Sequence, residues 1–277
     1  MLGKLEMLQR ERGAGLPRSV RLVALYIGAW FSSATLRAQA PFITDDDAVT
    51  RRGGWHVELF EQFSRLQELV RPALRQHTLV WSAMYGIIDG AEIGIDVPLI
   101  QIENAGLANA FGPGDLNFNV KFRLRDAPVT GWLPAWYGSI QFEIPTGDAS
   151  HSLGSGELDL VVTLIAERSI GTSGVLRANL GAQLLGNSLT GAIGIPRRGL
   201  IVVTSLAGGL RVHPRLQLLE EYSFAQAQYT DEHDREVRAQ LGCWITLREG
   251  WLLGVSYQAG WYATPLHQVQ VGVAVDY

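Results

Sequence analysis

One short loop of the sequence holds the three side-chain types of a hydrolytic triad. Asp148, Ser150 and His151 lie within four consecutive residues of a glycine-rich stretch. A serine nucleophile needs a histidine base, and this base needs an acid that orients it, so the three groups must converge with a fixed geometry. Here all three belong to one loop, and no second element brings a partner toward them. We therefore expect no enzyme activity and assign no catalytic residue.

A second group with possible chemistry is the acidic run Asp45, Asp46 and Asp47. Carboxylates are preferred calcium ligands, but the spaced Asp-x-Asp-x-Asp-Gly pattern of a calcium loop is missing. A solvated acidic segment or a periplasmic plug is therefore expected. The six histidines show no ligand spacing, and Cys243 is the single cysteine of the chain. We predict no bound metal, no internal disulfide and no cofactor.

The first forty residues have the order of a secretory signal peptide, with basic residues, an apolar run and then small residues. The apolar run over residues 22–36 has 15 residues, fewer than the roughly 20 that a membrane-spanning helix needs. We predict a signal peptide over residues 1–40, with Ala38 and Ala40 at the cleavage site. A periplasmic N-terminal segment over residues 41–52 would follow. A retained N-terminal anchor is the alternative.

The remainder of the chain is acidic. Removing residues 1–40 leaves 17 basic and 25 acidic side chains, and no basic cluster interleaved with aromatic residues is present. A nucleic-acid surface needs positive charge along the phosphates. We therefore exclude nucleic acid as a partner.

The last eleven residues alternate between two kinds of side chain. Val269, Val271, Val273, Val275 and Tyr277 share one parity, while Gln, Gly, Ala and Asp residues fill most of the other. Successive side chains of a strand point to opposite faces, so this strand has one apolar face. An alternating last strand with a terminal aromatic resembles the signal that bacterial outer-membrane barrels present to their assembly machinery. The same alternation also occurs in soluble β-sandwiches.

Nearly all of residues 53–277 divides into similar runs separated by Gly, Pro, Asn or Asp, without a convincing amphipathic helix. The runs begin near residues 55, 75, 92, 115, 136, 157, 176, 200, 216, 237, 251 and 267. Their number is even, as in single-chain outer-membrane barrels. Without an apolar helix after the signal, a closed barrel is the membrane-spanning structure left to this chain. We predict an all-β fold, a transmembrane antiparallel up-and-down β-barrel of about 12 strands.

Short and long connections alternate between these runs. Barrels place short turns on the periplasmic side and long loops outside, so an even strand number puts both termini in the periplasm. The connection over residues 126–134 is longer than this rule expects for a periplasmic turn.

Polar residues lie in register on the second face of several runs, where a barrel would direct them into its lumen. The candidate lumen-lining residues are Asp115, Asn117, Asn119, Lys121, Arg123, Arg125, Glu143, Asp159, Arg177 and Arg238. Opposing charges across a narrow lumen would select solutes by size and polarity. Alternatively, the same side chains fill the interior as hydrogen-bonded pairs, because a twelve-stranded barrel lies between filled and open sizes.

Three short motifs resemble those of a known family. They are Pro41, Thr44, Asp45 and Asp46 in a Pro-x-x-Thr-Asp-Asp opening, residues 145–148 and 153–156 in a Pro-Thr-Gly-Asp motif with a Leu-Gly-Ser-Gly tail, and a Gly-Asp-Leu strand start at residue 114. They resemble the outer-membrane family labelled "MetA-pathway of phenol degradation". This resemblance implies a small transporter-like barrel linked to the uptake of aromatic or other hydrophobic molecules. It carries no catalytic residues to transfer.

These observations lead to one main hypothesis and two alternatives. We expect a monomeric barrel in the outer-membrane lipid that passes small, hydrophobic or aromatic solutes passively. The first alternative is a closed barrel with a structural or adhesive role through its extracellular loops. The second is a secreted soluble β-sandwich.

Overall fold

The computed structural model of the protein describes residues 42, 44–45, 48–67, 73–128, 131–186, 198–228, 235–262 and 264–277. The expected signal peptide, with Ala38 and Ala40, lies outside the described residues, as do Pro41, Asp46 and Asp47.

The described residues form thirteen strands and one short 3-10 helix. The strands are β1 (Trp55–Arg65), β2 (Ala73–Ile88), β3 (Ala91–Asn104), β4 (Ala110–Pro113), β5 (Leu116–Arg125), β6 (Ala135–Ile144), β7 (Asp159–Ile170), β8 (Gly174–Leu184), β9 (Leu200–His213), β10 (Leu216–Ala225), β11 (Glu236–Arg248), β12 (Trp251–Tyr262) and β13 (His267–Asp276). The helix, η2, spans Ala149–His151.

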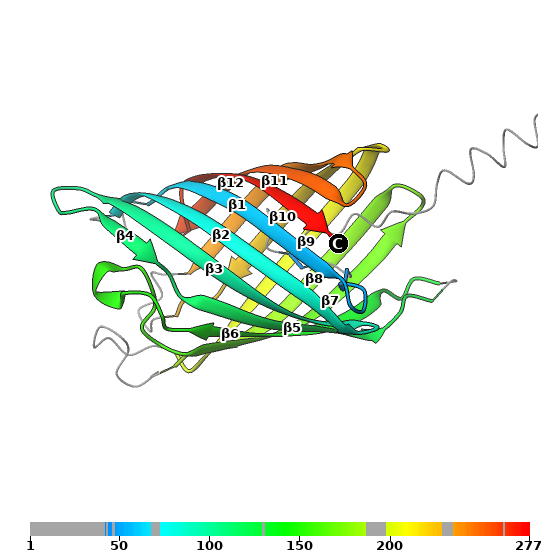
Figure 1. Ribbon diagram of the computed structural model, residues 1–277, viewed down its shortest axis with the longest axis horizontal. Helices are drawn as coiled ribbons and strands as arrows, with labels where there is room; N and C mark the ends of the chain where they lie inside the picture. The colour runs from blue at the N-terminus through cyan, green and yellow to red at the C-terminus, as the bar shows by residue number, and fades with distance from the viewer. Residues whose placement is uncertain are drawn as a thin grey trace, which may run out of the picture. The chain divides into compact units, whose positions relative to one another are not determined.

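Twelve of these strands close into one antiparallel barrel (Figure 1). Each strand pairs with its neighbour in sequence, β3 pairs directly with β5, and β1 pairs with β13 to close the ring. The predicted twelve-stranded up-and-down barrel is thus confirmed. A β-sandwich is wrong because one continuous sheet closes on itself instead of forming two packed sheets.

Strand β4 lies within the stretch that the sequence pattern assigns to a loop. It pairs with residues Leu99–Ile102 of β3, whereas β5 pairs with β3 only over Ala91–Asp96. Without β4, residues Leu99–Ile102 of β3 would have an unpaired edge on the side that faces β5. The short strand therefore completes the ladder where β3 extends beyond β5.

Tight turns and longer connections lie at opposite ends of the barrel, as the sequence predicts (Figure 1). The turns after β2 and β11 each use a glycine with positive φ, Gly90 at 83° and Gly250 at 72°. The first and last strands meet at this same end, where His56 lies opposite Asp276.

The long connection at the tight-turn end, residues 126–134, has a physical explanation. The Arg168 guanidinium on β7 donates hydrogen bonds to three of its carbonyl oxygens, those of Pro128 (3.2 Å), Gly131 (2.5 Å) and Leu133 (3.2 Å). One side chain thus satisfies several backbone groups that a shorter turn would not expose.

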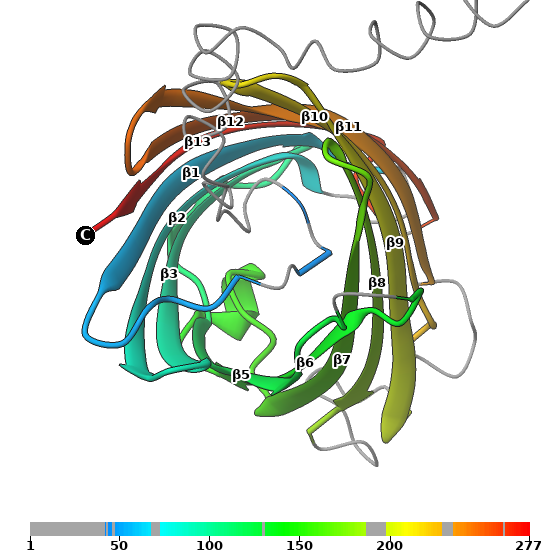
Figure 2. The ribbon, with the colours of Figure 1, turned by 90° about the vertical axis from the view of Figure 1, so that its right-hand side faces the viewer.

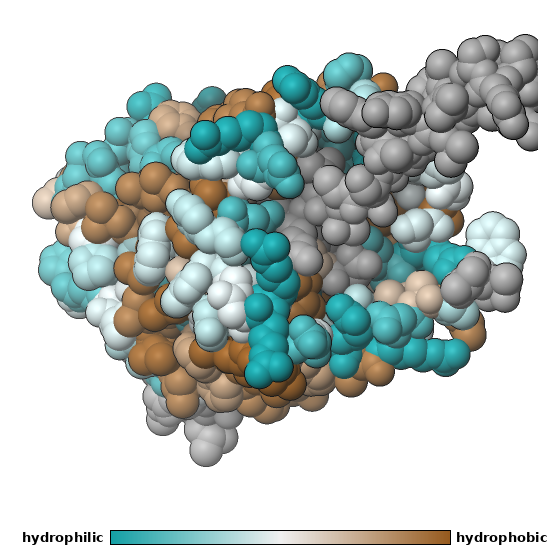
Figure 3. Space-filling view, turned by 45° about the vertical axis from the view of Figure 1, so that its right-hand side comes forward, coloured by the Kyte–Doolittle hydropathy of each residue, from teal (hydrophilic) through white to brown (hydrophobic). Residues whose placement is uncertain are grey.

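The outer wall of the barrel is apolar. Leu176, Leu180, Leu206 and Leu241 are each more than half exposed, and hydrophobic side chains cover much of the wall in Figure 3, with hydrophilic ones toward its ends. Apolar surface in this amount on alternating positions of every strand is the pattern of a lipid-facing barrel. Among the described residues, no helix is long and apolar enough to cross a membrane.

The last strand, β13, shows the two faces clearly. Val269 and Val271 are exposed on the outer wall, whereas Gln268 and Gln270 are buried on the inner face. Tyr277 follows the strand and is exposed. A role of this strand in assembly, including Val273 and Val275, stays a prediction.

Candidate functional site in the barrel lumen

The inward row of β5 carries three of the predicted lumen residues, and each makes a polar contact with a different partner. Gln141 on β6 donates a hydrogen bond to the side-chain oxygen of Asn117 (2.9 Å). Asn119 donates one to the carboxylate of Asp96 on β3 (2.9 Å). The third residue, Lys121, is buried. The alternation of β5 therefore places these three side chains on the inner face of the barrel.

The other two residues of this row lie at the tight-turn end. Arg123 forms an exposed ion pair with Asp126 (3.3 Å). Arg125 departs from the expected row because the register shifts between Arg123 and Arg125, so that Arg125 lies opposite Trp136. A bulge reverses the alternation of side chains beyond it, which no alternating pattern reveals.

Two of the predicted lumen acids bind the backbone of loops. The Asp115 carboxylate accepts hydrogen bonds from the backbone N–H groups of Gly147 (2.8 Å) and Ser155 (2.5 Å). Asp159 accepts one from the backbone of Gly186 (2.8 Å). These buried acids therefore fix the connections that follow β6 and β8. Glu143 lies opposite Asp159 in the β6–β7 ladder.

The remaining two candidates form ion pairs on the barrel wall. Arg177 on β8 donates to the buried Glu167 on β7 (2.7 Å), which lies directly opposite in the ladder. Arg238 on β11 pairs with Glu236 on the same strand. Both arginines thus have partners within the wall.

The segment before β1 enters the ring of strands. We call residues 42–52 the strap; its described residues are 42, 44, 45 and 48–52. Seen along the barrel, the part of the strap leading to β1 crosses the interior (Figure 2). Thr44, Asp45, Val49 and Thr50 are all buried.

Polar side chains of three strands hold the strap. Lys121 on β5 donates to the Asp45 carboxylate (2.6 Å), and this ion pair is buried. The strap also donates two backbone N–H bonds to buried carboxylates, from Thr44 to Glu221 on β10 (2.5 Å) and from Thr50 to Glu92 on β3 (2.5 Å). The strap is therefore anchored on different sides of the lumen.

Apolar packing and a close backbone approach also hold the strap in the lumen, and we call this bound position its seat. Val49 packs in a buried cluster with Ala135, Tyr137 and Ile165 of β6 and β7. The backbone of the strap lies directly on Gly86 of β2, where an added Cβ would come within 2.1 Å of the Arg51 carbonyl oxygen. No other residue type fits at position 86 while the strap is seated.

The lumen contains a cavity of 310 Å³ that adjoins Phe42 of the strap. Its lining comes from the strap and from seven strands: Phe42, Glu58, Phe60, Gln62, Val80, Ser82, Met84, Asp96, Pro98, Asn117, Asn119, Gln141, Arg238, Gln268 and Gln270. A small cavity of 40 Å³ adjoins Asp45 and Lys121. A groove of 540 Å³ is lined by exposed outer-wall residues such as Leu176 and Leu206, so we do not assign it to the lumen.

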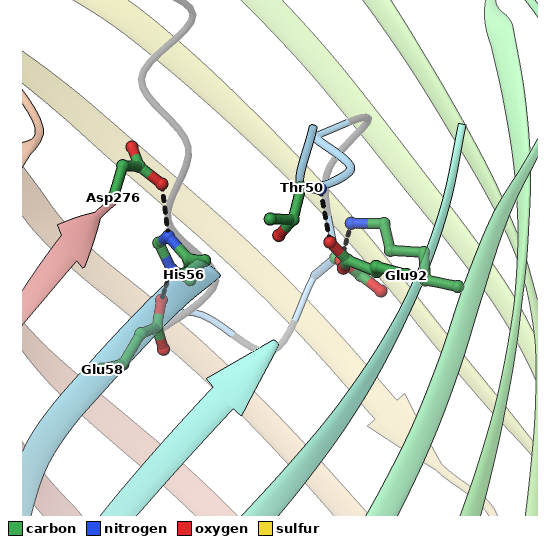
Figure 4. Close-up of polar contacts among 7 residues, drawn as sticks. Thr50, His56, Glu58, Glu92 and Asp276 are labelled. Atoms are coloured by element: carbon green, nitrogen blue, oxygen red, sulfur yellow. Dashed lines mark hydrogen bonds and ion pairs between the residues drawn. The ribbon is translucent and has the colours of Figure 1, made fainter. Parts of the chain in front are cut away.

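A second polar contact joins the two ends of the sheet. His56 on β1 lies between two carboxylates, with Nδ1 2.8 Å from Asp276 on β13 and Nε2 2.9 Å from Glu58 (Figure 4). His56 and Asp276 are cross-strand neighbours. We call this contact the clasp, and it lies where the barrel closes.

The loop that suggested a triad has the wrong geometry for a relay. Nδ1 of His151 lies near both Asp148 (2.7 Å) and Ser150 Oγ (3.2 Å), and Ser150 Oγ also donates to Asp148 (2.5 Å). A relay needs the acid and the nucleophile on different ring nitrogens. Instead, Asp148 caps η2 by accepting from the Ser150 backbone. Hydrogen bonds from Ser150 and then from His151 lower the pKa of Asp148 to about 2.

Among the described residues, no group of three or more His, Cys, Asp or Glu side chains is placed to hold a metal ion. The Asp45 carboxylate forms an ion pair with the Lys121 ammonium.

Sequence reasoning missed the wall residues that hold the strap. Glu92 and Glu221 each occupy an inward, buried position on a strand, where an acid needs a partner. The partner itself was not predictable, since the strap is separated from Glu221 by 177 residues.

The closed barrel resembles several solved structures. An outer membrane channel from Pseudomonas putida F1 aligns with a TM-score of 0.64 and 13% identity, covering 84% of this chain and 98% of that one. The NanC porin aligns with a TM-score of 0.55 and 6% identity, covering 80% and 98%. The translocator domain of the autotransporter NalP from Neisseria meningitidis aligns at 0.50 and 14%, covering 93% and 97%. These similarities show the fold. No protein-family model and no curated protein sequence matches the chain.

Proposed function

We propose that the protein is an outer-membrane channel for small solutes whose lumen is closed, in this conformation, by its own strap. The observation that carries this proposal is the polar cavity of 310 Å³ inside a lipid-facing barrel, bounded by Phe42 of the strap. A barrel built only to be filled would pack side chains through its centre. The structural neighbours named as a channel and a porin agree with a transport role.

The way in which the strap is held supports a closure that can open. Within its described residues, the strap shares no ladder with the barrel except one isolated bridge between Arg52 and Gly86. Three polar contacts of the strap, those of Thr44, Asp45 and Thr50, run to side chains of the wall. The strap can therefore leave the lumen while every strand pairing of the barrel stays intact.

The orientation and assembly of the barrel are part of the same proposal. Both termini lie in the periplasm, the long loops face outward from the cell, and the barrel acts as a monomer. The alternation from Val269 to Tyr277 serves the assembly machinery. A transported solute that is hydrophobic or aromatic remains an expectation from the resemblance to the phenol-degradation family.

A closed barrel with a structural or adhesive role is the second candidate. The loop contacts of Asp115 and Asp159 favour it, because they fix the connections after β6 and β8. In that case the strap would be a permanent part of the interior.

Single-channel recording in planar bilayers separates the two candidates. The wild-type protein, purified from outer membranes, is compared with a variant that lacks residues 42–50. We expect rare openings from the wild type and persistent conductance steps from the deletion. A folded state is verified by a band whose gel mobility changes on boiling. Silence from both folded proteins would overturn the channel proposal, and the point variant Gly86→Ala replaces the deletion if the latter does not fold.

A further inference from the structure

The 310 Å³ cavity beside Phe42 is lined mainly by two kinds of side chain, apolar ones and amides. Phe42, Phe60, Met84 and Pro98 supply apolar surface. Side-chain amides supply much of the rest, and they come from β1, β5, β6 and β13. A volume of 310 Å³ lies at the lower end of the range for small-molecule sites, about 300–1,000 Å³.

The amides form two groups within the lining. Asn117, Asn119 and Gln141 belong to β5 and β6, whereas Gln62, Gln268 and Gln270 belong to β1 and β13. Each amide has two N–H donors and one carbonyl acceptor. The bond from Gln141 to Asn117 uses one donor of the first and the acceptor of the second. A ligand with hydroxyl groups, which both donate and accept, matches such a lining.

Next to this lining, one further buried amide is left without a partner from the described part of the protein. Gln258 lies opposite Gln268 in the β12–β13 ladder and is 1% exposed. Among the residues that the structure describes, neither its amide nitrogen nor its oxygen has a hydrogen-bond partner. An unsatisfied buried amide is costly. A polar ligand that rearranges the adjacent glutamines would relieve this cost.

The charged side chains of the cavity already have partners. His56 binds Glu58 at 2.9 Å, Asn119 binds Asp96 at 2.9 Å, and Glu236 binds Arg238. A charged ligand would have to compete with these contacts and would lose its hydration in a confined space. The lining therefore favours an uncharged ligand.

The number of amides also argues against a ligand with a single hydroxyl group. Such a ligand would displace water from several amides and satisfy only one or two of them. A ring with hydroxyl groups around its edge satisfies many, while its face lies against the Phe rings.

The geometry points to a binding site for an uncharged, polyhydroxylated ring solute, a neutral sugar or a cyclic polyol. This inference names the solute class of the proposed channel and so rests on the proposed function. Because Phe42 belongs to the strap, a bound solute touches both the wall and the element that closes the lumen. The class differs from the aromatic solutes that the family resemblance implies.

Calorimetric titration of the detergent-solubilised full-length protein tests this site. The probes are glucose and myo-inositol, with glucose 6-phosphate and phenol as matched comparisons. We expect glucose or myo-inositol to bind at least about tenfold more tightly than glucose 6-phosphate and phenol, as two differing hydrogen bonds would produce. A preference for glucose over myo-inositol identifies a sugar, and the reverse identifies a cyclic polyol. Tighter binding of phenol, or no binding of either polyol, would overturn the inference.

Two variants make the test specific. Asn119→Leu keeps the side-chain size and removes an amide from the cavity, so affinity should fall about tenfold. Gln101→Leu makes the same kind of change at an exposed position of β3 outside this lining, and affinity should stay the same. An equal loss in both variants would contradict the site.

The outcome is distinguishable from failure of the channel proposal. A barrel that conducts ions but binds neither polyol overturns this inference alone. A barrel that binds a polyol but never conducts overturns the channel and leaves the binding site standing.

Discussion

The latch, Lys121–Asp45, and the clasp, His56–Asp276 with Glu58, are polar contacts of similar length in the same interior. The latch spans 2.6 Å. The two contacts of the clasp, which Figure 4 labels, span 2.8 and 2.9 Å. Lys121, Asp45, His56 and Glu58 are buried, whereas the side chain of Asp276 is 34% exposed. The latch and the clasp differ in what holds their partners together. A ladder of ten residue pairs between β1 and β13 keeps His56 beside Asp276, whereas the latch depends on the seat of the strap.

This difference separates a contact that stabilises the barrel from one that closes it. Breaking the clasp does not release any segment, since the ladder still pairs the strands. Breaking the latch removes the Lys121 ammonium from the buried Asp45 carboxylate. Asp45 belongs to the strap, whose described residues pair with the barrel strands only through the bridge between Arg52 and Gly86. We therefore expect changes near the strap to alter conductance, and changes at the clasp to alter thermal stability.

The largest expected effect on this comparison comes from Gly86→Ala. A Cβ at this position would lie 2.1 Å from the Arg51 carbonyl oxygen and 2.5 Å from that of Thr50. Such a clash cannot be relieved by a side chain that rotates, because both atoms belong to the backbone. The strap should leave its seat, and single-channel recordings should show a barrel that is open most of the time.

Gly208→Ala is the matched control, since the nearest atom to an added Cβ there is 3.9 Å away. It should keep the wild-type conductance. An unchanged conductance in folded Gly86→Ala would mean that the strap does not close the lumen.

The second change, Lys121→Met, removes one half of the latch. Removing one partner of a buried ion pair costs about 3–5 kcal/mol, and about 1.4 kcal/mol already changes an equilibrium tenfold. The open fraction in bilayer recordings should therefore rise by about two orders of magnitude, with the folded gel band retained.

The double variant Asp45→Asn/Lys121→Met sharpens this prediction. It replaces both charges with neutral groups, so most of the closing free energy should return. A double variant as open as Lys121→Met would show that the charge pair is not what holds the strap.

The third change addresses the clasp. His56→Leu removes the hydrogen bonds to Asp276 and Glu58, and we expect a loss of about 1–3 kcal/mol in the stability of the barrel. On gels, the folded band should change to the mobility of the unfolded protein at a lower temperature than for the wild type. Conductance should stay at the wild-type level. Raised conductance would show that the clasp and the strap are coupled, and the comparison between them would fail.

The sequence predicts the barrel well because its signal is repeated. Twelve runs alternate independently, and each places its apolar row on the lipid side, as Leu176 and Leu180 on β8 illustrate. The inward position of Asn117, Asn119 and Lys121 follows from the same alternation. Arg125 escapes the pattern because a single bulge reverses the parity.

The strap was not predictable in the same way. Asp45 and Thr50 carry no periodic pattern, and their partners lie between 42 and 76 residues away in the sequence. The conformation of such a segment is decided by the cavity that receives it. Only Gly86, a glycine inside a strand, gave a local indication of a close backbone approach.

The smallest effect concerns the ion pair His151–Asp148. Its length, 2.7 Å, is close to that of the latch, but both of its side chains are exposed. Ser150 and His151 lower the pKa of Asp148 from an ordinary 3.8 to about 2. A depressed carboxyl pKa gives stability that is present above the ordinary pKa and is lost as the pH falls through the lowered one. Hydrogen exchange at the Ser150 amide, corrected for its intrinsic rate, should therefore stay constant from about pH 7 to about pH 4 and accelerate near pH 2. Acceleration already above about pH 4 would mean that the cap depends on a group other than this carboxylate.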